Sequence, residues 1–129
     1  MSSLHKAVAA VIESVGLEAH YGRGPLEVTL PHTVWTLDVF PEGDTGGCRS
    51  EVSLTLEHVA RATGGVSGIA QVQSTAASFD LALQRAHIVG ATGSSSLVVR
   101  AGRSRVPDVD DEGVERLRCE YTFTWIDSL

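Results

Sequence analysis

The sequence contains few cysteines and none of the spaced motifs that build metal centres. Cys48 and Cys119 are its two cysteines, which are too few for a disulfide framework, and no CxxC pair or Cys/His cluster occurs. The five histidines are scattered without HxxxH or HxH spacing, so their pattern does not indicate a metal site. Cys119 alternates with polar residues, which predicts a buried free thiol. We therefore expect neither a metal nor a cofactor.

Long apolar runs and lysine are scarce as well. No apolar stretch approaches the roughly 18 residues of a membrane-spanning helix, and the N-terminus lacks the apolar core of a signal peptide, so we expect no membrane segment. Lys6 is the single lysine beside nine arginines, and the formal net charge is −6. An acidic balance of this kind argues against general binding to nucleic acids or to anionic membranes.

Motifs for catalysis and for nucleotide binding are also missing. No GxSxG elbow occurs, and the glycine-rich segment Gly64–Gly68 lacks the Lys-Ser/Thr ending of a P-loop. Asp108–Gly113 resembles the start of a calcium loop, but Cys119 stands where the loop needs its bidentate Glu. These absences favour a protein that works through shape and contact.

The strongest pattern in the chain lies at its C-terminal end, from Glu115 to Ile126. Apolar and polar residues alternate there, with Leu117, Cys119, Tyr121, Phe123 and Trp125 between Arg116, Arg118, Glu120, Thr122 and Thr124. A period of two predicts a strand with one apolar and one polar face. At about 3.3 Å per residue this strand spans roughly 40 Å, so we expect it to form the centre of the sheet. Its polar face is predicted to meet water or another subunit.

Weaker patterns predict the remaining elements. In chain order these are a helix over 3–15, strands over 33–40 and 50–59, a helix over 72–90 and a strand over 96–100, with a turn-rich segment over 101–113. No repeat or linker divides the chain, so residues 1–129 are predicted to form a single domain. The fold class predicted is α+β, with a mainly antiparallel sheet of about four to five strands and two helices packed on one face.

Arginines supply the candidate interface positions. Arg100, Arg103 and Arg105 form a small basic cluster before an acidic run, which is typical of a solvated loop or, alternatively, of a contact with an acidic partner. Arg116 and Arg118 lie on the polar face of the final strand. These five residues are the interface candidates.

The C-terminal half combines four elements in an order that is typical of one protein family. They are the helix over Ser78–Val89, the short strand over Ser96–Arg100, the acidic turn PDVDDEG and the strand VERLRCEYTFTW. This half resembles the tail terminator and tail-completion proteins of long-tailed bacteriophages. Those proteins are of similar size and begin with an amphipathic helix, as Leu4–Val15 does here. They continue with a β-meander, a second helix and a final hairpin.

The resemblance implies a non-enzymatic structural virion protein of the α+β class. Such a subunit assembles with itself into a ring, usually a hexamer, at the head-proximal end of the tail tube. There the ring stops tube growth, contacts the tail tube protein and joins the head–tail connector protein. DNA would pass through its lumen without specific binding, because an acidic lumen repels phosphates.

Other functions remain open from the sequence. One is another head–tail or tail component, and a second is a small non-catalytic oligomeric binding domain that uses the open face of the sheet. A third is an enzyme with its site between the second helix and the sheet, using His58, His87 or Asp80. A pocket holding titratable groups with shifted pKa values would favour the enzyme.

Overall fold

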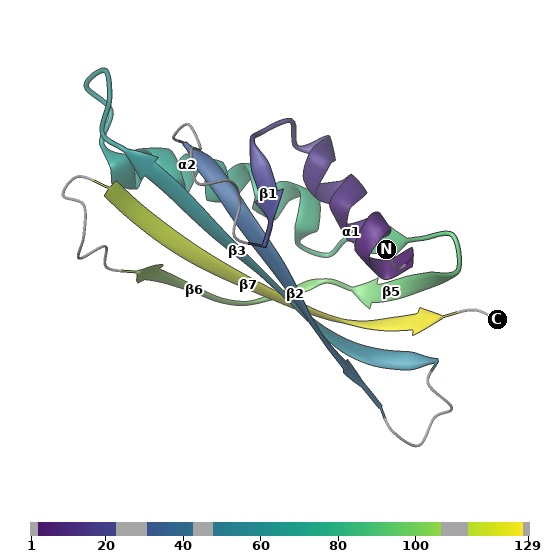
Figure 1. Ribbon diagram of the computed structural model, residues 1–129. Helices are drawn as coiled ribbons and strands as arrows, with labels where there is room; N and C mark the ends of the chain where they lie inside the picture. Colours follow the sequence, from purple (N-terminus) through teal and green to yellow (C-terminus); the bar gives the residue numbers. More distant parts are fainter. Residues whose placement is uncertain (1–2, 23–30, 43–47, 107–113, 128–129) are drawn as a thin grey trace.

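Two helices and seven strands make up the described chain. The computed structural model describes residues 3–22, 31–42, 48–106 and 114–127. The elements are α1 (Ser3–Ser14), β1 (Ala19–Tyr21), β2 (His32–Pro41), β3 (Arg49–Arg61), α2 (Gly68–Leu83), β4 (His87–Val89), β5 (Gly93–Leu97), β6 (Val99–Val106) and β7 (Val114–Asp127). Both helices lie on one face of a single twisted sheet (Figure 1). None of the described helices is long and apolar enough to cross a membrane.

The two longest strands form the centre of the sheet. The strand order is β1-β2-β3-β7-β5-β4, and β6 pairs with β7 beyond the stretch that pairs with β5. β3 and β7 are antiparallel along their whole length, from Arg49 opposite Ile126 to Arg61 opposite Val114. The final strand therefore has neighbours on both sides, as the sequence predicts.

The predicted two helices beside a large sheet are confirmed, but the predicted number of strands is wrong. The sheet has seven strands rather than about four to five, and it curves into a half-barrel. It is also mixed, because β1 pairs with β2 in parallel while the other pairs are antiparallel. β1 and β4 contain three residues each, too few to produce a periodic pattern.

The prediction of a strand over 96–100 followed by a turn is also wrong. β5 ends at Leu97, and β6 begins at Val99 and continues to Val106. Val98 lies between them and bonds to the segment that joins α2 to β4: its N–H donates to the carbonyl of Ala86 at 2.9 Å, and its carbonyl accepts from Arg85 N–H at 2.8 Å. An irregularity between Arg100 and Gly102 interrupts the alternation within β6, which explains why the sequence indicates a turn there.

The second helix begins earlier and ends earlier than predicted. Ser67 caps its first turn by accepting a hydrogen bond from Ala70 N–H at 3.1 Å, and the helix ends at Leu83. Residues 87–89, which the prediction places in the helix, form strand β4. The helical spacing of apolar residues continues past the true end of the helix, through Ala86 and Val89, although Val89 is exposed.

The core fills the space between the helices and the inner face of the sheet. Helix α1 contributes Leu4, Val8 and Ile12, and α2 contributes Val72, Ala76, Phe79 and Leu83. The inner face of β7 is buried at every alternate position from Leu117 to Trp125, which confirms the two-faced pattern read from the sequence. Cys119 is a buried free thiol, also as predicted. Neither of the two described helices covers the opposite face of the central strands.

Candidate functional site

A hollow lies on the face of the sheet that the helices leave open. Its volume is about 490 Å³, and it is lined by Gly22, Val34, Thr36, Thr55, Glu57, Arg116, Arg118 and Glu120. These residues come mainly from β2, β3 and β7, whose side chains alternate between the core and this face. We call this concavity the outer hollow. Six of its eight lining residues have polar side chains, so it fits a partner that makes hydrogen bonds and ion pairs.

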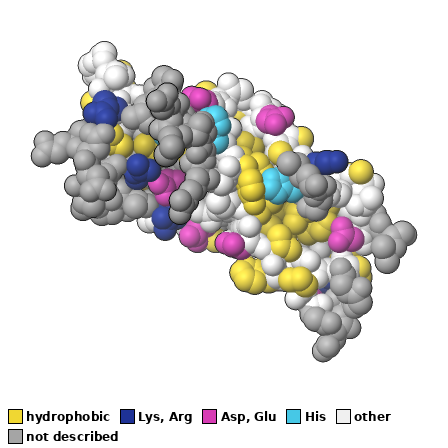
Figure 2. Space-filling model, in the orientation of Figure 1, with side chains coloured by type: hydrophobic (Ala, Val, Ile, Leu, Met, Phe, Trp, Pro, Cys, Tyr) yellow, Lys and Arg dark blue, Asp and Glu magenta, His cyan; other side chains and the backbone are white. Residues whose placement is uncertain are grey.

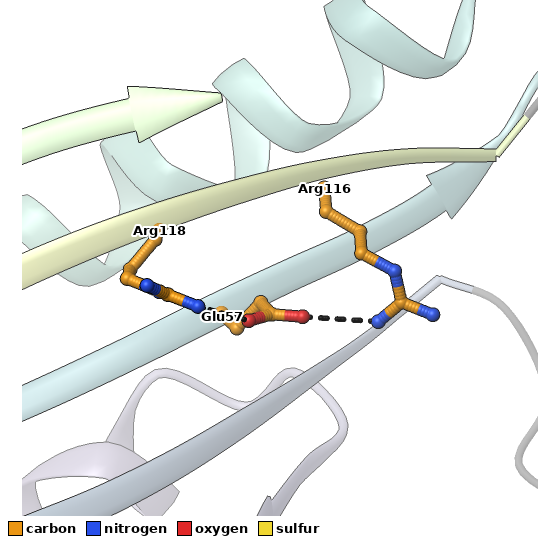
Figure 3. Close-up of polar contacts among 3 residues, drawn as sticks. All are labelled: Glu57, Arg116 and Arg118. Atoms are coloured by element: carbon orange, nitrogen blue, oxygen red, sulfur yellow. Dashed lines mark hydrogen bonds and ion pairs between the residues drawn. The ribbon is translucent and has the colours of Figure 1, made fainter. Parts of the chain in front are cut away.

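Two arginines share one carboxylate at one end of the outer hollow (Figure 3). Glu57 lies directly opposite Arg118 in the β3–β7 register. Arg116 Nη1 lies 3.0 Å from Glu57 Oε1, and Arg118 Nη2 lies 3.5 Å from Glu57 Oε2. Ion pairs this exposed contribute little to stability. The two guanidinium groups and the carboxylate therefore lie together on the surface of the sheet.

The five arginines predicted as one interface lie in two separate places. Arg116 and Arg118 line the outer hollow, as described. Arg100, Arg103 and Arg105 lie on β6 rather than in a loop, opposite the core residues Tyr121, Cys119 and Leu117 of β7. The sheet therefore lies between the Arg116/Arg118 pair and the side chains of Arg100 and Arg103.

Arg100 is engaged within the chain. Its Nη1 lies 3.3 Å from Asp80 Oδ1, and the same carboxylate oxygen accepts a hydrogen bond from the Tyr121 hydroxyl at 2.8 Å. The main-chain N–H of Arg100 donates to Gln84 Oε1 at 2.8 Å. Burial, and then the bond to Asp80, raise the pKa of Tyr121 well above its usual range. These contacts attach α2 to β6 and β7, so Asp80 and Arg100 have a structural role here.

The histidines considered for catalysis do not meet. His58 lies in the core with 1% of its surface exposed, its Nδ1 2.8 Å from Thr33 Oγ1 and its ring stacked on Phe79. Burial, with a smaller effect of Arg103, lowers the pKa of His58 to about 4, so the ring is neutral at pH 7. His87 is exposed on β4, and β7 and β5 lie between it and β3. The two histidines therefore cannot act together.

The described part of the chain also shows no metal centre. No group of three or more His, Cys, Asp or Glu side chains is placed to hold an ion among residues 3–22, 31–42, 48–106 and 114–127. The calcium-like run Asp108–Gly113 lies outside the described residues.

An apolar surface lies beside α1 along β1 and β2. Figure 2 shows hydrophobic side chains gathered in this region. His5, Tyr21 and Trp35 form a ring cluster there, with centroids 4.1 to 5.2 Å apart. Tyr21 is half exposed, and Phe40 near the end of β2 is 61% exposed. Exposed aromatic side chains next to a sheet edge are a common feature of protein–protein contacts.

The sequence indicated the polar face of these strands but not which residues meet on it. Thr55 and Glu57 alternate with buried residues of β3, and that signal was readable. Their approach to Arg116 and Arg118 depends on the β3–β7 register, which joins residues about 60 positions apart and has no local signal.

Comparison with known proteins finds a similar fold among solved structures. No family model matches the sequence, and no curated protein matches it either. Among solved structures, the fold is similar to that of a chain in the virion of a native gene transfer agent (GTA) particle, with a TM-score of 0.70 and 16% sequence identity. The alignment covers 96% of this chain and 92% of that chain. The similarity therefore concerns the fold, and it extends over nearly the full length of both chains.

Proposed function

We propose that this protein is a structural component of a phage-like virion. The observation that carries the proposal is the fold similarity to a chain of the gene transfer agent virion, which covers 96% of this sequence at a TM-score of 0.70. Coverage of that extent in both chains argues against a likeness confined to a common sheet motif. The resemblance of the C-terminal half to tail terminator proteins points to the same class independently.

Two open sheet edges support self-assembly. β1 pairs only with Thr33–Trp35 of β2, so in the described chain Thr36–Pro41 has a partner on one side alone. β6 likewise pairs only with β7 among the described strands. Unpaired strand edges are templates for pairing with another chain. Two different edges on one subunit favour head-to-tail contacts, which close into rings when the rotation between subunits allows it.

The specific role proposed is that of a tail terminator. In this role the subunits form a ring, usually a hexamer, at the head-proximal end of the tail tube. The ring contacts the tail tube protein on one side and the head–tail connector on the other, and DNA passes through the lumen. The net charge of −6 supports passage without specific binding, because phosphates are repelled by an acidic surface. The role requires no catalysis.

Electron microscopy with mass measurement tests this proposal. The purified protein is imaged by negative stain across a concentration series, alone and mixed with assembled tail tubes, while light scattering gives its mass. Six-subunit rings, or caps at one end of the tubes, are expected. Rings or small oligomers that do not bind the tubes would favour another head–tail component or an oligomeric binding domain. A monomer at all concentrations would refute the proposal.

A further inference from the structure

The open stretch of β2 directs main-chain groups away from the sheet. Successive residues of a strand direct their N–H and C=O groups alternately to one side and to the other. On the side where β1 lies, the carbonyl of Trp35 accepts a hydrogen bond from Gly22 N–H at 2.9 Å, and the pairing with β1 ends at Trp35. Leu37 and Val39 come next in the alternation. Their N–H and C=O groups therefore point to a side that no described strand occupies.

The open side of β6 has the same arrangement. Thr124 N–H of β7 donates to a side chain of β5, so the even-numbered residues of β7 bond to the side on which β5 and β6 lie. Ser104 of β6 lies opposite Arg118 of β7 and therefore bonds to β7. Its neighbours Arg103 and Arg105 direct their main-chain groups to the opposite side, where β6 has no partner among the described strands.

The two open stretches have the same length. On β2, the pairing with β1 reaches Trp35 at one end, and Pro41 has no N–H to offer at the other. On β6, Arg100 N–H is already bonded to Gln84 Oε1, and the register shifts directly after it. Five residues remain on each strand, Thr36–Phe40 on β2 and Gly102–Val106 on β6.

We propose that β6 of one copy adds to the open stretch of β2 in a second copy. Within one chain β2 and β6 run in opposite directions (Figure 1), so they pair antiparallel when both copies turn their helices to the same side. The register that uses all of the open groups sets Val39 opposite Arg103 of the other copy. Leu37 then lies opposite Arg105, and each pair exchanges both N–H···O bonds. This inference rests on the self-assembly proposed above and names the contact that joins the copies.

Side chains on the outer face complement one another in this register. Phe40, which is 61% exposed, comes to lie opposite Gly102 of the other copy. A Cβ at Gly102 would meet no described atom within 4 Å beyond its chain neighbours, so there is room for the ring. An aromatic ring opposite an edge glycine covers main chain that is otherwise exposed. Asp38 comes to lie opposite Ser104, whose hydroxyl is a donor for the carboxylate.

Charge favours this pairing over the two symmetric ones. Pairing β2 with β2 through the same groups sets Asp38 opposite Asp38 of the second copy, and pairing β6 with β6 sets Arg103 opposite Arg105. Like charges directly opposite each other destabilise a strand pair. Thr36–Phe40 contains one acidic and no basic residue, whereas Gly102–Val106 contains two arginines and no acidic residue. Opposite charges therefore attract the copies in head-to-tail order.

Disulfide cross-linking tests the register. Asp38 and Ser104 form a non-hydrogen-bonded pair in it, with Cα atoms about 4.5 Å apart, which is within the range of a disulfide. The variants are Asp38→Cys and Ser104→Cys, each in a Cys48→Ser background that leaves the buried Cys119. Oxidation of a 1:1 mixture should give at least about tenfold more covalent dimer, with one chain of each variant, than either variant gives alone.

A third cysteine variant provides the matched control. Ser74 is exposed on α2 rather than on a strand edge, so Asp38→Cys mixed with Ser74→Cys should give only the background of random collisions. A mixed Asp38–Ser104 dimer no more abundant than this background would overturn the inference. Dimers that form from Asp38→Cys alone would also overturn it, because β2 would then pair with itself.

A proline tests the main-chain bonds without a cross-link. Val39 N–H faces away from β3, so Val39→Pro leaves the β2–β3 ladder intact, as prolines on edge strands do. The far-UV circular dichroism spectrum should be unchanged, while self-association in sedimentation equilibrium weakens at least about tenfold. Leu81→Ser removes a side chain that is 89% exposed on α2, and this control should associate like the unaltered protein. A folded Val39→Pro protein that associates like the unaltered one would contradict the pairing.

These results separate the contact from the role proposed above. Rings that cap tail tubes, form with Val39→Pro and are never bridged between positions 38 and 104 would overturn the inference and leave the proposed function standing. Head-to-tail cross-links in assemblies that never bind tail tubes would support the inference and remove the tail terminator role.

Discussion

The buried His58 should make the stability of the fold depend on pH in a defined window. Its pKa is about 4 in the folded state, because burial removes the ring from water, whereas an exposed histidine titrates near 6.5. Between these values the unfolded chain binds the proton and the folded chain does not. Stability is therefore fully present above about pH 6.5 and declines as the pH falls towards 4. The gap between the two pKa values corresponds to about 3 kcal/mol.

Urea unfolding from pH 7.5 to pH 4 measures this effect. The comparison protein is His58→Leu with Thr33→Val, which removes the titrating ring and also the hydroxyl that bonds to it at 2.8 Å. Carboxylates and the other histidines titrate in both proteins, so the difference between the two pH profiles isolates His58. The free energy of unfolding of the unaltered protein should fall more steeply, by about 3 kcal/mol over the window. Parallel profiles would show that His58 has the same pKa in the folded and the unfolded chain, which would contradict the effect of burial.

Three substitutions test other features of the fold by chemical denaturation. Tyr121→Phe should cost about 1 kcal/mol, because the hydroxyl that donates to Asp80 is lost; no loss would mean that water replaces the bond. Arg85→Gly should stabilise by about 0.5 to 1 kcal/mol, because Arg85 has a φ of 62°, and destabilisation would contradict that geometry. Gly93→Ala should cost about 1 to 3 kcal/mol, since its Cβ would lie 2.7 Å from the carbonyl oxygen of Ile126 and 2.8 Å from the Trp125 ring; a neutral result would mean that both the main chain and the ring can shift.

Local periodicity was sufficient to predict the elements that alternate without interruption. β7 alternates from Leu117 to Trp125 with a buried residue at every second position, so its two faces could be read directly. β3 has the same pattern from Val52 to His58. In α1, the helical spacing of Leu4, Val8 and Ile12 matches the buried face. In each case one periodic pattern agrees with one buried face.

Prediction failed where tertiary contacts decide the structure. His87–Val89 continues the apolar spacing of α2, but Arg85 N–H bonds to Val98 and turns the chain into a strand. The basic cluster on β6 was predicted to lie in a loop because its side chains are polar. It lies on a strand instead, and polar side chains are compatible with β6 because this strand pairs on one side only among the described strands. The outer hollow depends on the register that brings Glu57 beside Arg118, and nothing local in the sequence records that register.

The pairing of β3 with β7 has a consequence for how the chain reaches its native state. Arg118 and Glu57 are 61 residues apart in the sequence. Along the chain, α2 and strands β4, β5 and β6 separate β3 from β7, although the two strands are neighbours in the sheet. Closing so long a loop costs conformational entropy before any β3–β7 hydrogen bond can form, and this slows folding. During synthesis, β3 is made well before β7 and must wait with its β7-pairing edge unsatisfied until the C-terminal strand has left the ribosome. We therefore expect a C-terminally truncated chain to expose that edge and to aggregate instead of folding.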